Sequence, residues 1–81
     1  MTKNPDAIKL WLARSLRGAA EAEKFRLLAG LAVQLGRPEG EVKNLLIKSR
    51  KFGIGSVKSM KKAIENGFDP NPHREAHEEK N

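Results

Sequence analysis

The sequence predicts an all-α fold, a small bundle of about four helices in one domain. Leu, Ala, Ile and Val dominate the apolar residues, and no stretch shows the alternation of apolar and polar side chains that is typical of a strand. Apolar residues instead recur at helical spacing, and Gly and Pro residues separate the stretches that carry them. A domain of this size buries only about 60% of its unfolded surface, so we expect no deep catalytic cleft.

The first helix is predicted over residues 5–17. Asn4 can cap its N-terminus through the side-chain oxygen, and Pro5 suits the first helical position. Apolar residues recur at helical spacing from there, and Gly18 is expected to end the helix. Trp11 lies on the apolar side and is interpreted as a core anchor.

The second helix is predicted over residues 19–35. One side of this helix is apolar and carries Ala22, Phe25, Leu28, Ala32 and Leu35. Gly36 follows at a position where a glycine with positive φ commonly closes a helix.

Two further helices are predicted over residues 38–51 and 57–66. Pro38 sets the backbone for the start of the third helix, and Ser56 is expected to cap the fourth. Residues 52–55, Phe-Gly-Ile-Gly, are expected to separate them, and Gly67 is expected to end the last one.

Positive charge is concentrated in the middle of the chain. Residues 1–36 carry a net charge of +3, residues 37–62 carry +6 and residues 63–81 carry −3. A basic stripe beside an acidic segment is typical of a protein that binds a polyanion. The alternative is that these lysines only keep helix faces in water.

One resemblance lies within residues 28–51. Ala32, Gly36, Val42 and Leu45 stand at the spacing of a helix-turn-helix, in which a small residue and a turn glycine let two helices pack at a steep angle. The stretch LAVQLGRPEGEVKNLLIKSRK resembles the promoter-reading helix-turn-helix of sigma factors and LuxR-type regulators. The family usually has Thr or Ser where this chain has Glu41. The resemblance implies that residues 38–51 form a recognition helix, whereas the alternative is an ordinary helix pair with a solvated polar face.

A weaker resemblance covers residues 52–67. The Phe-Gly-Ile-Gly segment resembles the turn of a helix-hairpin-helix motif, in which Gly53 and Gly55 would let backbone N–H groups approach a phosphate. The run to residue 71 is also similar to part of a bacterial small-subunit ribosomal protein. A flexible linker between helices is the alternative.

These observations predict a small basic DNA-binding protein, a transcriptional regulator with a helical domain at residues 1–68 and a flexible charged tail at residues 69–81. Asn44 is expected to pair with adenine, and the basic side chains with phosphates or guanine. The predicted contact residues are Arg37, Lys43, Asn44, Lys48, Arg50, Lys51, Gly53, Gly55, Lys58, Lys61 and Lys62. The alternatives are a regulator that binds an acidic surface on another protein, such as a polymerase, a nuclease or a ribosome-associated protein, and an RNA-binding module.

No enzymatic activity, cofactor or metal site is predicted. The chain has no cysteine, and its two histidines, His73 and His77, have no further strong ligands beside them. No signal peptide or membrane span is recognised, so a cytoplasmic location is expected. A homodimer stays open, because the wide apolar arc of the first helix could either support a dimer or cover the core.

Overall fold

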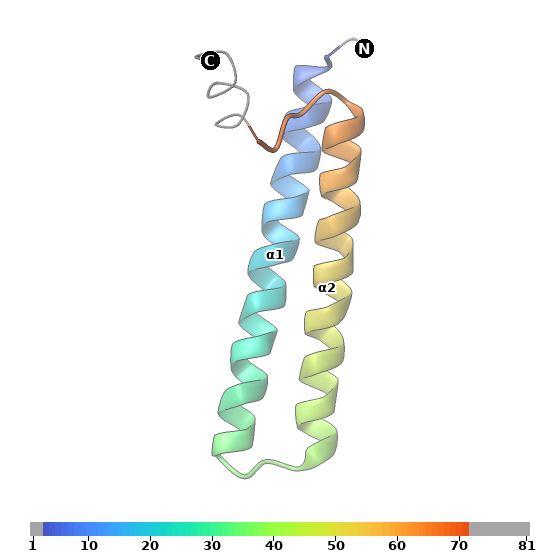
Figure 1. Ribbon diagram of the computed structural model, residues 1–81. Helices are drawn as coiled ribbons and strands as arrows, with labels where there is room; N and C mark the ends of the chain where they lie inside the picture. Colours follow the sequence, from blue (N-terminus) through green and yellow to red (C-terminus); the bar gives the residue numbers. More distant parts are fainter. Residues whose placement is uncertain (1–2, 72–81) are drawn as a thin grey trace.

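The protein is described by a computed structural model of residues 3–71, which contains two long α-helices. They are α1 (Pro5–Gln34) and α2 (Glu39–Glu65). The helices lie antiparallel and side by side along their whole length, joined by a short loop (Figure 1). The described part contains no strand, which confirms the all-α class. It measures 54 × 28 × 13 Å, so the molecule is a single layer of helices.

The prediction of four helices is wrong, because each pair of predicted helices forms one continuous helix. Gly18, expected to end the first helix, lies in the middle of α1. Residues 52–55, expected to form a turn, are helical within α2. Ser56 therefore does not cap a helix.

The helix ends predicted at Gly36 and Gly67 are confirmed. Gly36 and Gly67 have φ angles of +68° and +105°, a conformation that glycine adopts without steric penalty. At the end of α1 the N–H groups of Gly36 and Arg37 donate to the carbonyls of Val33 and Ala32, at 3.1 and 2.9 Å. This pair of bonds satisfies carbonyls that the helix itself leaves free.

The predicted start of α1 is also confirmed. The Asn4 side chain accepts a hydrogen bond of 3.2 Å from the N–H of Ala7, and Pro5 is the first helical residue. The N–H of Asn4 donates to the carbonyl of Asn66 at 3.0 Å, which ties the beginning of α1 to the end of α2. The hairpin is thus fastened at its open end as well as by its loop.

Small residues form most of the seam between the two helices. The seam positions alternate in steps of four and three residues, the repeat of a coiled coil. On α1 they are Trp11, Ser15, Gly18, Ala22, Phe25, Ala29 and Ala32, and on α2 they are Val42, Leu45, Ser49, Phe52, Ser56, Ser59 and Ala63. Of the described residues only Ser15, Ala29, Ala32 and Ala63 are buried.

The helix backbones approach closely at Gly18. A Cβ atom at this position would lie 3.1 Å from the carbonyl oxygen of Phe52 and 3.1 Å from the Cβ of Ser56. A glycine inside a helix costs about 1 kcal/mol relative to alanine, and the close packing offsets this cost. Gly18 therefore does not end α1. Its missing side chain lets the backbone of α2 approach α1.

Serine side chains bond the two helices across the seam. The hydroxyl of Ser15 donates to the carbonyl oxygen of Ser56 at 2.9 Å, and the hydroxyl of Ser56 donates to the carbonyl oxygen of Ser15 at 2.7 Å. Ser49 donates to the carbonyl oxygen of Ala22 at 2.8 Å. Such short side chains reach the opposite backbone only because the helices are close.

A narrow seam leaves most of the large apolar side chains outside it. Thirteen Leu, Ile, Val and Phe residues of the described part are exposed, from 40% at Phe52 to 67% at Leu16 and Leu35. Trp11, expected as a core anchor, is half-buried at the edge of the seam. The hairpin therefore has two broad faces, and the composition of each decides what it can bind.

Candidate nucleic-acid interface

The seam divides the remaining side chains between two faces. A helix turns by about 100° per residue, so residues just before a seam position lie on one side and residues just after it lie on the other. In an antiparallel pair the "before" positions of both helices share one face. A surface hollow confirms this arrangement of the "before" positions, because it is lined by Arg14, Arg17 and Glu21 of α1 together with Lys51 and Gly55 of α2.

The face formed by the residues before the seam positions is strongly basic, and we call it the basic face. It carries seven Lys or Arg residues and two Glu residues. These are Arg14, Arg17, Lys24, Lys48, Lys51, Lys58, Lys62, Glu21 and Glu41. The same face also carries the exposed Leu10, Leu28 and Leu31, two of which line a hollow near the loop. All seven cationic side chains are exposed.

Most of these cations are not neutralised by other residues of the described part. Lys24 pairs with Glu21 at 2.7 Å, and Lys62 lies 3.6 Å from Glu65. The described part of the chain offers no ion pair to the other five, which are Arg14, Arg17, Lys48, Lys51 and Lys58. Their charge is available to an external anion.

Aromatic rings lie beside the cations at the edge of the seam. The rings of Phe25 and Phe52 stack with centroids 5.7 Å apart and planes 11° from parallel. Lys24 and Lys48 place their Nζ atoms 4.7 and 5.5 Å from the centroid of Phe25. The guanidinium of Arg14 lies 4.8 Å from the ring centroid of Trp11. These contacts hold three of the cations close to the helix surface.

Two adjoining hollows run along the basic face. One has a volume of about 420 Å³ and is lined by Arg14, Arg17, Gly18, Glu21, Lys51, Phe52, Gly55 and Ser59. The other, of about 280 Å³, is lined by Trp11, Lys58, Ser59, Lys61, Lys62 and Glu65. They share Ser59 and form a shallow groove that is open to solvent. Gly55 lacks a side chain that would stand at the edge of this groove.

The opposite face, formed by residues after the seam positions, is mainly apolar, and we call it the apolar face. Its residues are Leu12, Leu16, Ala19, Glu23, Arg26, Gly30 and Val33 of α1 and Lys43, Leu46, Arg50, Gly53, Val57, Met60 and Ile64 of α2. Arg26 donates to Glu23 at 3.1 Å, and this hydrogen bond lowers the pKa of Glu23 below its ordinary value.

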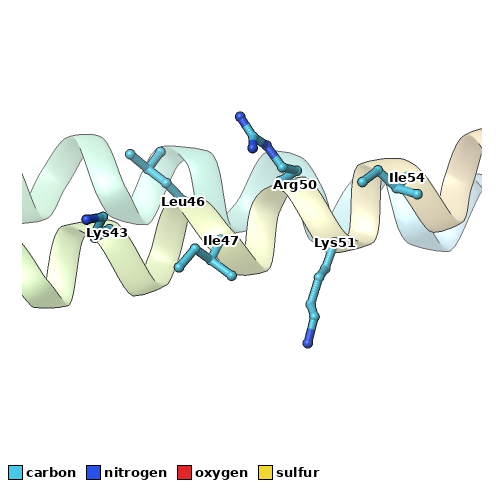
Figure 2. Close-up of a pocket in the computed structure, with 6 residues that line it drawn as sticks. All are labelled: Lys43, Leu46, Ile47, Arg50, Lys51 and Ile54. Atoms are coloured by element: carbon cyan, nitrogen blue, oxygen red, sulfur yellow. The ribbon is translucent and has the colours of Figure 1, made fainter.

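The predicted contact residues do not form a single surface. Lys48, Lys51, Lys58 and Lys62 belong to the basic face together with Asn44, whereas Lys43 and Arg50 belong to the apolar face. Figure 2 shows Arg50 and Lys51 extending from α2 in opposite directions. The hollow between them is lined by Leu46, Ile47 and Ile54 as well as Lys43, so it is largely aliphatic.

The other predicted contact residues lie in the loop, on the outer side of α2 or within α2. Arg37 stands in the loop and pairs with Glu41 at 2.7 Å, and Lys61 points outward from α2 at the end of the groove. Gly53 faces α1, with Ala22 4.0 Å from the place of a Cβ atom. Gly53 and Gly55 are both inside α2, where backbone N–H groups bond within the helix, so the expected phosphate-binding turn is not formed.

The geometry around the loop also differs from the steep crossing that the helix-turn-helix resemblance implies. Residues 19–34 belong to α1 and residues 39–51 to α2, and these segments run antiparallel (Figure 1). The hydroxyl of Ser49 reaches the backbone of Ala22, so the helices are still in contact far from the loop. A role of residues 38–51 in reading promoter sequence stays a prediction.

Arg14, Arg17 and Lys24 of α1 belong to the basic face and were not predicted as contacts. The signal that identifies them is the coiled-coil repeat of small residues, which places each of them one residue before a seam position. Without the antiparallel pairing, these residues have no visible connection with the lysines of α2.

Neither helix of the described part is long and apolar enough to cross a membrane. Residues 3–71 contain no group of three His, Cys, Asp or Glu side chains that could hold a metal ion. His73 and His77, and most of the tail expected to be flexible, lie outside the described residues. In comparisons with family models, with curated proteins and with solved structures, nothing matches this chain.

Proposed function

We propose that the protein binds nucleic acid, in the first place duplex DNA, through the basic face. The observation that carries the proposal is the clustering of seven exposed Lys and Arg residues from both helices on one face. The opposite face carries only three, and one of these is paired with Glu23.

The shape of the basic face suits a phosphate backbone better than a small anion. Lys51 and Lys58 are separated by two helical turns, a rise of about 10 Å, and Arg14 and Arg17 border the same groove from α1. The cations thus form an extended array along a straight rod. A rod with spaced cations can contact several phosphates of a duplex without reading base edges.

Energetics favour a polyanion over a single charged ligand. Each exposed cation gains little from one isolated ion pair in water. A nucleic acid instead releases its condensed counterions when several phosphates are neutralised together. The proposal therefore requires a strong dependence of affinity on salt.

Titration of labelled duplex DNA with the full chain at several salt concentrations tests the proposal. If the five cations that have no ion pair within residues 3–71 each meet a phosphate, log K should fall with log salt with a slope of about −4.5. The Lys51→Gln/Lys58→Gln variant should have a slope smaller in magnitude by about 2, because two phosphate contacts are removed.

The control is Lys43→Gln/Arg50→Gln, which removes the same charge from the same helix on the opposite face. Its slope should stay within experimental error of the parent chain. A control that loses more binding than Lys51→Gln/Lys58→Gln would overturn the basic face and favour the recognition-helix interpretation. Equal binding to single-stranded DNA or structured RNA would overturn the preference for duplex DNA, and no binding to any nucleic acid would overturn the proposal itself.

A further inference from the structure

We propose that a second copy of this chain covers the apolar face, so that two hairpins stack face to face as a four-helix bundle. This inference is independent of what the basic face binds. It rests on the distribution of apolar side chains, charge and area on the opposite face.

The half of the apolar face near the chain ends carries no charge from Leu12 to Ala19 and from Val57 to Ile64, and Lys9 lies just beyond it, after Ile8. Its side chains are Leu12, Leu16 and Ala19 of α1 and Val57, Met60 and Ile64 of α2. Leu16, Val57 and Ile64 are 67%, 57% and 42% exposed. Helices in a single layer cannot bury such side chains against each other, and stable folds place a second layer against them.

The opposite face of the same segment carries Arg14, Arg17, Lys51, Lys58 and Lys62. A second copy placed on that face would bring like charges together, which is unfavourable. On the apolar face, by contrast, two copies can meet without charge repulsion in this segment. The charge distribution thus selects the face on which self-association occurs.

The area of the apolar face is sufficient for a stable dimer. Thirty residues of α1 span about 45 Å, and two helices side by side are about 20 Å wide, which gives roughly 900 Å². A standard stable interface buries about 800 Å² on each partner. A second hairpin therefore fits the face without needing a further element.

The charge pattern also selects the orientation of the second copy. Glu23, Arg26, Lys43 and Arg50 all lie in the half of the face near the loop. A two-fold axis along the length of the hairpin places uncharged half on uncharged half, and stacks α1 of each copy on α2 of its partner. The carboxylate of Glu23, which pairs with Arg26 of its own chain, then lies at the level of the partner's Arg50, since Ala22 and Ser49 are neighbours across the seam. Its negative charge offsets part of the net +2 that the loop half of each copy carries. Every neighbouring helix pair in this bundle is antiparallel, as in up-down bundles.

A two-fold axis across the hairpin would instead place the uncharged half over the partner's charged half. Four ionised side chains of each copy would then lose water against apolar residues without gaining partners. The lengthwise axis is the one that we propose.

Sedimentation equilibrium of the full chain tests the stoichiometry. We expect twice the 9.0 kDa chain mass at micromolar concentration. Leu16→Lys should raise the dimer dissociation constant by about 100-fold or more, because two lysines would enter the apolar contact. Leu27→Lys changes an equally large leucine, 58% exposed on the outer side of α1, and should leave the dimer intact. A monomeric parent chain, or equal effects of the two variants, would overturn the proposal.

A distance measurement tests the orientation without disturbing the interface. The chain has no cysteine, so Gln34→Cys gives a single attachment site for a spin label at the loop end of α1. The lengthwise axis places the two labels less than half the 54 Å hairpin length apart. A separation near the full length would overturn this orientation, and the absence of any dipolar coupling would overturn the dimer.

Discussion

Ser15 and Ser56 show how the residues of the seam set the distance between the helices. Each hydroxyl donates to the backbone carbonyl of the other residue, and no buried side-chain polar atom of the described residues lacks a partner. A serine of an isolated helix would bond to its own helix or to water instead. The reciprocal bonds fix both the separation and the axial position of α1 against α2.

Gly18 also sets the distance between the two helices, because it lies against the backbone of α2. Gly18→Val should lower the free energy of unfolding by about 1–3 kcal/mol, because the new side chain would overlap the backbone of Phe52 and Ser56. Chemical denaturation followed by helical circular dichroism measures this change. Ala20→Val, an exposed position on the outer side of α1, should cost only about 0.5 kcal/mol of helix propensity. Equal losses in the two variants would show that the helices do not approach at Gly18.

The two helices are longer than the sequence predicts because the glycines have different roles in the same chain. Gly36 and Gly67 adopt positive φ and end helices, whereas Gly18, Gly53 and Gly55 are helical. An isolated glycine looks the same in both settings. Only the neighbouring helix, which packs against Gly18, shows that this glycine belongs to the seam.

At the scale of α2, alanine substitutions distinguish a helix from a turn at residues 52–55. Gly55→Ala should raise the free energy of unfolding by about 0.5–1 kcal/mol, because the site is helical and has open space for a Cβ atom. Gly36→Ala should lower it by about 1 kcal/mol, because alanine resists a φ of +68°. Thermal and urea unfolding of both variants measures these effects. A destabilised Gly55→Ala variant would instead support a turn at this point.

The helical class, the start of α1 and both glycine-ended helix termini could be predicted from local signals. Asn4, Pro5, Gly36 and Gly67 act through bonds to residues next to them, so the sequence is sufficient there. The pairing of α1 with α2 could not be predicted in this way, because it depends on contacts between residues far apart in the sequence, such as Ser15 and Ser56, which are 41 residues apart. The lysines of α2 on the basic face were predicted because they lie in the basic middle of the chain. Arg14, Arg17 and Lys24 were missed, because only the pairing of the helices places them beside these lysines.

The hairpin places a cationic surface and an apolar surface on opposite faces, whereas a single amphipathic helix carries both on one narrow rod. The chain-end half of the molecule is cationic on one face and, from Leu12 to Ala19 and from Val57 to Ile64, uncharged on the other, with the close seam between them. If both proposals hold, a dimer directs its two basic faces away from each other. The two faces would then be on opposite sides of a bundle about two helix layers thick, roughly 20 Å.

Such a dimer should bridge two DNA duplexes. Mixing the protein with donor-labelled and acceptor-labelled duplexes should give energy transfer between them at one dimer per two duplexes. The Leu16→Lys variant should keep the salt-dependent binding of one duplex, since its basic face is intact, and lose the energy transfer. Lys51→Gln/Lys58→Gln should weaken both the binding of a duplex and the energy transfer while remaining dimeric in sedimentation. Energy transfer that persists in a monomeric Leu16→Lys protein would mean that a single hairpin holds two duplexes, and that the two faces do not divide binding and assembly between them.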